Sequence, residues 1–199
     1  MTQLHAISRV RPVERVTVLD TDPVVAASYN RRVAFLDRPT TVVNPEGDTR
    51  LLADVDVLCT CTSVDVGKGP VLRDGEHRPW LHVNAIGADF PGKQELPLPM
   101  LERAVLCPDL PSQCRFEGES QWVQPDRIGP DLATLVKHRS SYEPYRSVLT
   151  VFDSTGWALE DLVVAELFIE LASREGIGST VTLQRTATDP FDPYALITP

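Results

Sequence analysis

The residues best suited to chemistry lie at positions 84–95, in the segment Asn-Ala-Ile-Gly-Ala-Asp-Phe-Pro-Gly-Lys-Gln-Glu. This segment follows a short apolar strand and places a carboxylate, Asp89, in a turn rich in glycine and proline. In chains that alternate strands and helices, ligands bind in the crevice beyond the carboxyl ends of the strands. A carboxylate held there is a candidate general acid or base. The alternative is that Asp89 only forms the turn by bonding its own backbone.

A second carboxylate, Asp20, ends a strand that we predict over residues 15–20. A strand that ends in an acidic residue and is followed by a helix is half of a dinucleotide-binding unit. The carboxylate in such a unit accepts hydrogen bonds from the ribose hydroxyls. The next helix starts at Asp22-Pro23, so Asp20 or Asp22 has the alternative role of capping it.

The elements that must position these carboxylates alternate along the chain. Apolar and β-branched runs predict strands, and 3.6-residue periodicity predicts helices. The predicted strands cover residues 15–20, 40–43, 55–60, 80–86, 104–107 and 149–152. The predicted helices cover residues 2–10, 22–35, 131–138 and 158–174. This alternation indicates an α/β, Rossmann-like fold with a mostly parallel sheet covered on both faces.

The glycine-rich phosphate motif of that fold is missing. It belongs about 20 residues before the acidic strand end, and neither GxGxxG nor a P-loop motif occurs in the sequence. We therefore expect residues 1–185 to form a partial NAD(P)-binding Rossmann domain that lacks the first strand and the Gly-rich loop. Residues 186–199 are expected to be a loosely ordered tail. This is the pattern of the C-terminal portion of a larger enzyme.

Composition excludes several other classes of protein. The net charge of −9 argues against nucleic-acid binding, which needs basic side chains to neutralise phosphates. No apolar run is long enough for a membrane span, and nothing reads as a signal peptide, so a cytoplasmic protein is expected. The cysteines Cys59, Cys61, Cys107 and Cys114 lack the spacing of a zinc site and are expected to be reduced, mostly buried thiols.

Three segments together resemble the ornithine cyclodeaminase/mu-crystallin family. They are Val-Thr-Val-Leu-Asp-Thr-Asp-Pro at 16–23, Asp-Val-Leu-Cys-Thr-Cys-Thr at 56–62 and Ile-Gly-Ala-Asp-Phe-Pro-Gly-Lys-Gln-Glu-Leu at 86–96. A supporting match is Val-Phe-Asp-Ser-Thr-Gly-Trp-Ala-Leu-Glu-Asp at 151–161. The Gly-Ala-Asp-Phe-Pro-Gly-Lys stretch is quite specific, and the resemblance covers residues 2 to about 185.

The resemblance implies a role for each matching residue. Asp89 takes the position of the catalytic carboxylate, which transfers a proton at the substrate amine while hydride passes between the α-carbon and the nicotinamide. The cofactor-binding residues implied are Asp20, Thr60, Cys61, Thr62, Gly87 and Ser154. The cofactor is NAD, with NADP less favoured, because the Asp20 carboxylate would repel a 2′-phosphate.

Several of these residues have structural alternatives. The threonines at 60 and 62 suit a strand end by β-propensity alone, and Ser154 or Thr155 suits a helix N-cap equally well. His82 is expected to be a hydrogen-bonded core histidine. Lys93 has Glu95 or a substrate carboxylate as partners, and a solvated role is favoured.

Two functions follow from the resemblance. The first is an NAD-dependent, ornithine cyclodeaminase-like enzyme that deaminates and cyclises a small amino acid and is incomplete as this chain. The alternative is a non-catalytic, truncated family member that acts as a binding or partner subunit. The expected assembly is a homo-oligomer or a complex with a complementing N-terminal chain.

Overall fold

The computed structural model describes residues 1–36, 39–43, 51–181, 189, 191, 192 and 194. The chain divides into two compact units, Met1–Trp157 and Ala158–Pro199. The boundary that we predict at residue 185 lies outside the described residues. The second unit contains one long helix, α6 (Ala158–Glu175).

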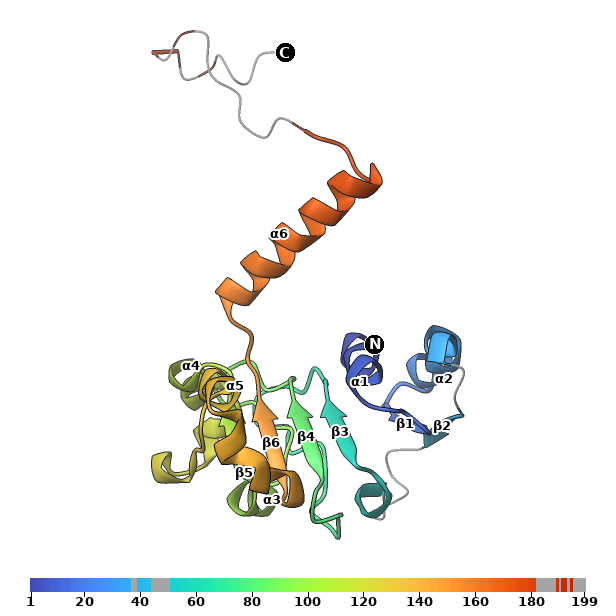
Figure 1. Cartoon of the computed structure of the whole chain (residues 1–199), viewed down its shortest axis with the longest axis vertical. Coiled ribbons are helices and arrows are strands. Elements are labelled where there is room, and N and C mark those ends of the chain that lie inside the picture. The colour runs from blue at the N-terminus through green and yellow to red at the C-terminus, as the bar shows by residue number, and fades with distance from the viewer. Residues whose placement is uncertain (37–38, 44–50, 182–188, 190, 193, 195–199) are drawn as a thin grey trace. The chain divides into compact units, whose positions relative to one another are not determined.

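The first unit alternates strands and helices in chain order (Figure 1). Its strands are β1 (Val16–Leu19), β2 (Thr40–Val43), β3 (Val57–Thr60), β4 (His82–Ala85), β5 (Val105–Pro108) and β6 (Thr150–Asp153). Its α-helices are α1 (Thr2–Val10), α2 (Pro23–Arg32), α3 (Leu98–Arg103), α4 (Pro111–Glu117) and α5 (Leu132–Lys137). Short 3₁₀ turns are η1 (Ala34–Leu36), η2 (Leu51–Asp54), η3 (Glu119–Trp122), η4 (Pro125–Arg127) and η5 (Arg139–Ser147).

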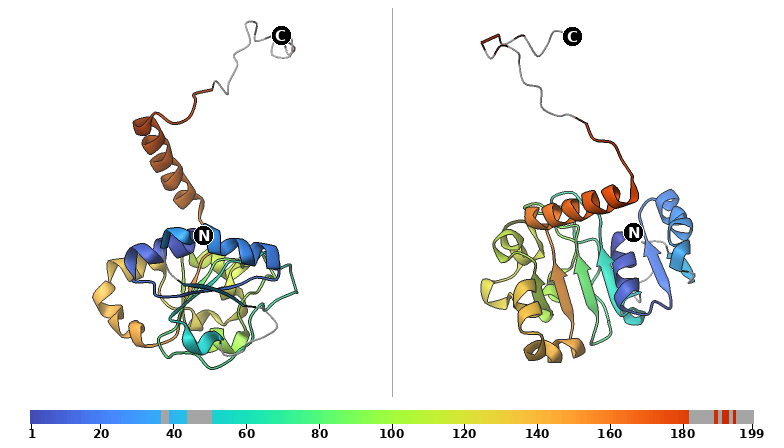
Figure 2. Two further views of the ribbon diagram at one scale, coloured as in Figure 1. Left: turned by 90° about the vertical axis from the view of Figure 1, so that its right-hand side faces the viewer. Right: turned by 45° about the horizontal axis from the view of Figure 1, so that its top comes forward.

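The six strands form two parallel sheets. One has two strands in the order β1-β2, and the other has four in the order β3-β4-β6-β5. Figure 1 shows the arrowheads of β3, β4 and β6 at one edge, and the right-hand view of Figure 2 shows these three strands in the same order. Strand β5 pairs parallel to β6. Parallel pairing therefore brings the carboxyl ends of β3, β4, β5 and β6 to a single edge of the sheet, and this edge positions most of the candidate site.

Helices α2 and α5 each begin at an aspartate that caps the helix, and α2 also has a proline at its first position. The Asp22 carboxylate accepts hydrogen bonds from the backbone N–H groups of Val24 and Val25, and Pro23 occupies the first helical position of α2. Asp131 caps α5 in the same way through Thr134 N. The predicted capping role of Asp22 is confirmed.

The hydrophobic core lies under the four-stranded sheet. Its buried members come from the strands and from the segments before and after them: Leu52, Leu81, Val83, Ala85, Leu96, Met100, Leu101, Ala104, Leu106, Leu149 and Val151. The two-stranded sheet is packed less deeply, because Leu19 and Val42 are each 38% exposed and Val18 is its buried apolar residue among those described. The four-stranded sheet is thus the firmly packed part of the first unit.

All six predicted strands are present, within two residues of their predicted ends. The predicted helix at 22–35 ends earlier, at Arg32, and η1 follows. Helices α3 and α4 were not predicted, because each is only six or seven residues long and, unlike the equally short α5, begins without a capping side chain.

Candidate functional site

Asp89 lies in the loop that follows the carboxyl end of β4. Its side chain is 53% exposed, and one of its oxygens accepts a hydrogen bond from Lys93 Nζ at 2.7 Å. This contact differs from the Glu95 pairing and from the solvated role predicted for Lys93, while the predicted contact with a substrate carboxylate stays a prediction. The Lys93 side chain is 22% exposed, so the carboxylate is the more exposed member of the pair.

Asp20 follows the last residue of β1 and is half-buried. One of its oxygens accepts a hydrogen bond from Asp22 N at 2.9 Å. Asp20 therefore bends the chain into α2, while Asp22 caps that helix. Of the two residues predicted as alternative caps, Asp22 is the one that caps α2. The Asp20 carboxylate stays at a strand end, where a ribose contact is expected.

The turn after β3 carries three further predicted residues. Thr60 is buried, with 4% of its surface exposed, and its Oγ1 has no hydrogen-bond partner among the described residues. The Cys61 residue as a whole is exposed, but partial desolvation of its thiol, reinforced by the nearby Glu95, raises the pKa of that thiol. Thr62 donates hydrogen bonds through both its backbone N and its Oγ1 to one oxygen of Glu95, at 2.7 and 2.8 Å.

Gly87 faces the same glutamate from the end of β4. Its backbone N donates a hydrogen bond to Glu95 Oε2 at 2.8 Å. A Cβ at this position would lie 2.3 Å from Glu95 Oε1 and 2.5 Å from the backbone oxygen of Thr62, so only glycine fits. The structure thus brings two of the predicted residues, Thr62 and Gly87, onto one buried carboxylate.

A second buried glutamate, Glu119 of η3, supports the first. Its Oε1 accepts hydrogen bonds from the backbone N–H groups of Glu95 and Leu96, at 2.6 and 3.2 Å. Its Oε2 is buried and has no partner among the described residues. Burial, reinforced by the nearby Asp153 and Glu95, raises the pKa of Glu119 to about 8.

Asp153, the last residue of β6, completes this arrangement. Its Oδ1 accepts from Glu119 N at 2.9 Å, and its Oδ2 accepts from the N and Oγ of Ser120 at 2.8 and 2.6 Å. The residue is fully buried, and burial raises its pKa to about 6. Each of these side-chain contacts holds η3 against the carboxyl end of β6.

Ser154 follows directly and bonds to a residue at the end of a neighbouring strand. Its hydroxyl donates to Asp109 Oδ2 at 2.7 Å, and Asp109 follows the carboxyl end of β5. The Cys114 thiol donates to the other oxygen of Asp109 at 3.0 Å. Ser154 therefore joins the ends of β6 and β5, and this contact leaves its predicted cofactor role as a prediction.

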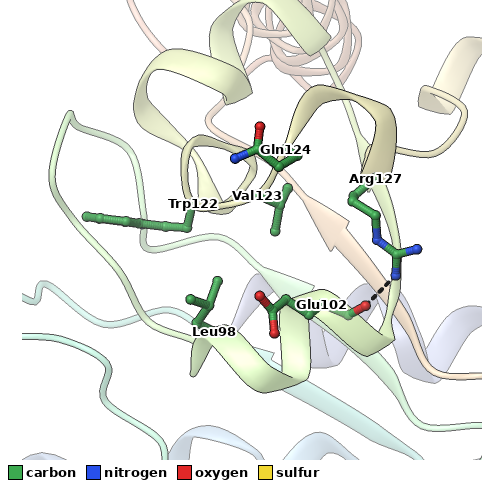
Figure 3. A pocket seen from close by; sticks show the side chains of 6 residues that line it. All are labelled: Leu98, Glu102, Trp122, Val123, Gln124 and Arg127. Carbon is green, nitrogen blue, oxygen red and sulfur yellow. Dashed lines mark hydrogen bonds between the residues drawn. The ribbon is translucent and has the colours of Figure 1, made fainter.

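The described residues also contain a shallow pocket of about 460 Å³, drawn in Figure 3. It is lined by Leu98, Glu102, Trp122, Val123, Gln124 and Arg127. The Arg127 guanidinium donates to the backbone oxygen of Glu102 across one side of it. The lining contains none of the predicted site residues, so the pocket is separate from the site described above.

His82 and the four cysteines are the remaining residues for which the sequence predicts a structural role. His82 is half-buried, its ring nitrogens lie 2.8 Å from Thr150 Oγ1 and 3.0 Å from Asn84 Oδ1, and burial lowers its pKa. All four cysteines are free; Cys107 and Cys114 are buried and Cys59 is half-buried.

Among the described residues we find no group of three or more acidic, histidine or cysteine side chains suited to a metal ion. In that same part of the chain, no helix is both long enough and apolar enough to span a membrane.

Comparison with known proteins decides the family. The model of the ornithine cyclodeaminase/mu-crystallin family matches residues 1–176. The chain belongs to this family. An L-lysine cyclodeaminase of Streptomyces rapamycinicus is 42% identical over 196 residues, which cover 98% of the chain and 56% of that protein. The ornithine cyclodeaminase of Agrobacterium fabrum is 26% identical over 198 residues, which cover 98% of the chain and 54% of that protein.

Solved structures of the family agree in fold. A lysine cyclodeaminase, studied for its recognition of L-lysine, L-ornithine and L-2,4-diaminobutyric acid, superposes with a TM-score of 0.88 at 46% identity, over 98% of the chain and 56% of its own length. A dimeric archaeal alanine dehydrogenase with bound NAD gives a TM-score of 0.77 at 26% identity, over 92% of the chain and 57% of its own length. The Rossmann-like α/β prediction is confirmed, and the chain spans about half the length of the relatives that it matches.

The buried carboxylates are the part of the site that the sequence did not reveal. Glu95 figured there only as a partner for Lys93, and Glu119, Asp109 and Asp153 were not singled out. A weak signal was available for Glu95, since a glutamate follows Asp89 within the specific family stretch. Nothing local marks Glu119, because its partners lie 23 and 24 residues away.

Proposed function

We propose that this chain supplies the NAD-binding part of a cyclodeaminase that acts on a small diamino acid of the L-lysine or L-ornithine type. The observation that carries the proposal is Asp89, an exposed carboxylate in the loop after β4, in a chain 42% identical to an L-lysine cyclodeaminase. Ligands of α/β folds bind beyond this edge of the sheet. We assign the cofactor-binding part to residues 1–185.

Two residues of the chain offer polar groups to the cofactor. Asp20 offers a carboxylate at a strand end for the ribose hydroxyls and favours NAD, because it would repel a 2′-phosphate. The buried Thr60 Oγ1, which has no partner among the described residues, is suited to a polar group brought by a ligand. No glycine-rich phosphate loop occurs among the 199 residues, so these residues do not account for the pyrophosphate.

The chemistry assigned to this chain is proton transfer. When bound, NAD would supply reversible hydride transfer at the substrate α-carbon, so that no net oxidation occurs. Asp89 would accept a proton as the α-amine becomes an imine. The side-chain amine then adds to that imine carbon, and Asp89 returns the proton as ammonia leaves. Lys93, at 2.7 Å, would hold the carboxylate in position.

Cofactor binding is the first test. NADH fluorescence titration of the protein should give saturable binding, with NADPH bound more weakly. Asp20→Asn should reduce the difference in affinity between NADH and NADPH. Absence of NADH binding would contradict the proposal and favour the non-catalytic alternative.

Catalysis is the second test. Ammonia release from L-lysine and L-ornithine by the complete enzyme that contains this chain, measured with NAD in catalytic amount, should fall by about 100-fold or more in Asp89→Asn. The matched control is Asp74→Asn, which breaks a surface ion pair with Arg103. Equal rates for wild type and Asp89→Asn would refute the assigned role of Asp89.

A further inference from the structure

We infer that Glu95 is a positioning residue that fixes the Asp89 loop against the Thr62 turn. This inference deepens the proposed function and rests on it, since it concerns the same reaction edge of the sheet. Glu95 does not itself reach the reacting atoms in this assignment. It would act through the two segments that it joins.

The geometry of the link is direct. Glu95 Oε1 accepts from the backbone N and the Oγ1 of Thr62, in the turn after β3. Its Oε2 accepts from the backbone N of Gly87, two residues before Asp89 in the loop after β4. One side chain therefore sets the distance between a turn predicted to contact the cofactor and the loop that carries the proposed catalytic carboxylate.

Glu95 is itself held firmly. The residue is fully buried, its backbone N donates to Glu119 Oε1 at 2.6 Å, and its backbone O accepts from Val71 N and Leu72 N at 3.0 and 3.3 Å. A side chain anchored on its backbone and bonded at both oxygens has little freedom to move. Buried networks in which the members are bonded on every side rigidify the segments that they join.

The absence of space at Gly87 supports the same reading. Because a Cβ there would lie 2.3 Å from Glu95 Oε1, the loop packs against the glutamate in a way that only glycine allows. Displacement of about 1 Å at a reacting group can cost about 100-fold in rate, so fixing this distance matters for Asp89.

The test replaces Glu95 by glutamine. One of the two sets of N–H donors, at Thr62 or at Gly87, would then face an amide NH₂ group, which cannot accept. Hydrogen–deuterium exchange without cofactor should become about tenfold faster at residues 60–64 and 85–90. The same variant should lose about tenfold or more in kcat for ammonia release, with a smaller change in KM for the amino acid.

Two further variants separate positioning from general destabilisation. Asp74→Asn makes a matched acid-to-amide change at a surface ion pair and should alter neither segment. Thr62→Val keeps the backbone bond to Glu95 and loses the hydroxyl bond, so it should speed exchange at 60–64 alone. Thr62→Val also tests the inference if Glu95→Gln does not fold.

The outcomes distinguish the two claims. Exchange that rises equally at 149–153, on β6, would make Glu95 merely structural and overturn the inference. Faster exchange at both turns with an unchanged kcat would also overturn it, while leaving the proposed function intact. If the wild type binds no NADH, the proposed function fails, and this inference fails with it.

Discussion

The carboxyl-end edge of the four-stranded sheet and the β1-β2 pair hold their acidic residues in opposite ways. At the first edge, Glu95, Glu119 and Asp153 are fully buried, and each accepts backbone N–H groups from a neighbouring segment. At the end of β1, Asp20 and Asp22 bond to residues only two or three positions further along the chain.

This difference shows which carboxylates stabilise tertiary contacts and which stabilise only local structure. A buried carboxylate that is satisfied by distant backbone donors ties several loops to one another, and removing it leaves those donors unpaired. A carboxylate that caps its own helix organises one turn and nothing else. The edge that carries Asp89 is therefore rigid through tertiary contacts, whereas the edge that carries Asp20 is set locally.

Removing Asp153 should break the rigid edge most severely. Asp153→Ala deletes the acceptors for Glu119 N, Ser120 N and Ser120 Oγ. We expect the free energy of unfolding to fall by about 3 kcal/mol, measured by urea denaturation. The matched change on the other sheet, Asp20→Ala, should cost about 0.5 kcal/mol. Equal losses in the two variants would remove the contrast between the edges.

The pH dependence of stability should report the buried glutamate. Burial raises the pKa of Glu119 from 4.5 to about 8, so between these values the folded protein holds a proton that the unfolded chain releases. The contribution of Glu119 to the free energy of unfolding is therefore fully present below pH 4.5 and is lost toward pH 8, by at most about 1.4 kcal/mol per pH unit. Asp153, raised from 3.8 to about 6, adds to the decline below pH 6.

The variant Glu119→Gln isolates this effect. Glutamine keeps the acceptor for Glu95 N and Leu96 N and resembles the protonated acid. It should match the wild type at pH 5 and exceed it in stability at pH 8.5, as followed by urea midpoints at both values. A variant that is less stable than wild type at both pH values would show that Glu119 is ionised in the folded protein.

Loss of a helix cap should test whether the two-stranded sheet opens by itself. Asp22→Ala removes the acceptor for two N–H groups of α2 and should cost about 1 kcal/mol. Hydrogen exchange should rise at residues 16–19, because α2 packs on β1 and β2, and stay unchanged at 82–85. The matched cap variant Asp131→Ala should leave both strands unaffected. Faster exchange at 82–85 in Asp22→Ala would mean that the two sheets unfold as one.

The smallest effect is expected at Thr60. Its buried hydroxyl has no partner among the described residues, so Thr60→Val should raise the stability of the cofactor-free protein by about 0.5 kcal/mol. If this hydroxyl meets the cofactor, the same variant should bind NADH several-fold more weakly. A stability loss in thermal melts would show that Oγ1 has a partner in solution.

Much of the fold was predictable because its signals are local. Runs of apolar and β-branched residues mark the six strands, and the pair Asp22-Pro23 marks the start of α2 through a cap and a preset backbone angle. The specific stretch around Asp89 marks the loop after β4. These features depend on neighbours within a few residues, so a linear reading recovers them.

The sequence by itself therefore determined the alternation of elements, the family resemblance and the two carboxylates at strand ends. Only the tertiary structure decided the strand order, the separation into two sheets and the roles of Glu95, Glu119 and Asp153. The physical reason is that burial of a carboxylate depends on donors brought from 8 to 34 residues away. No local pattern records which acidic residue, among many at the surface, folding will enclose.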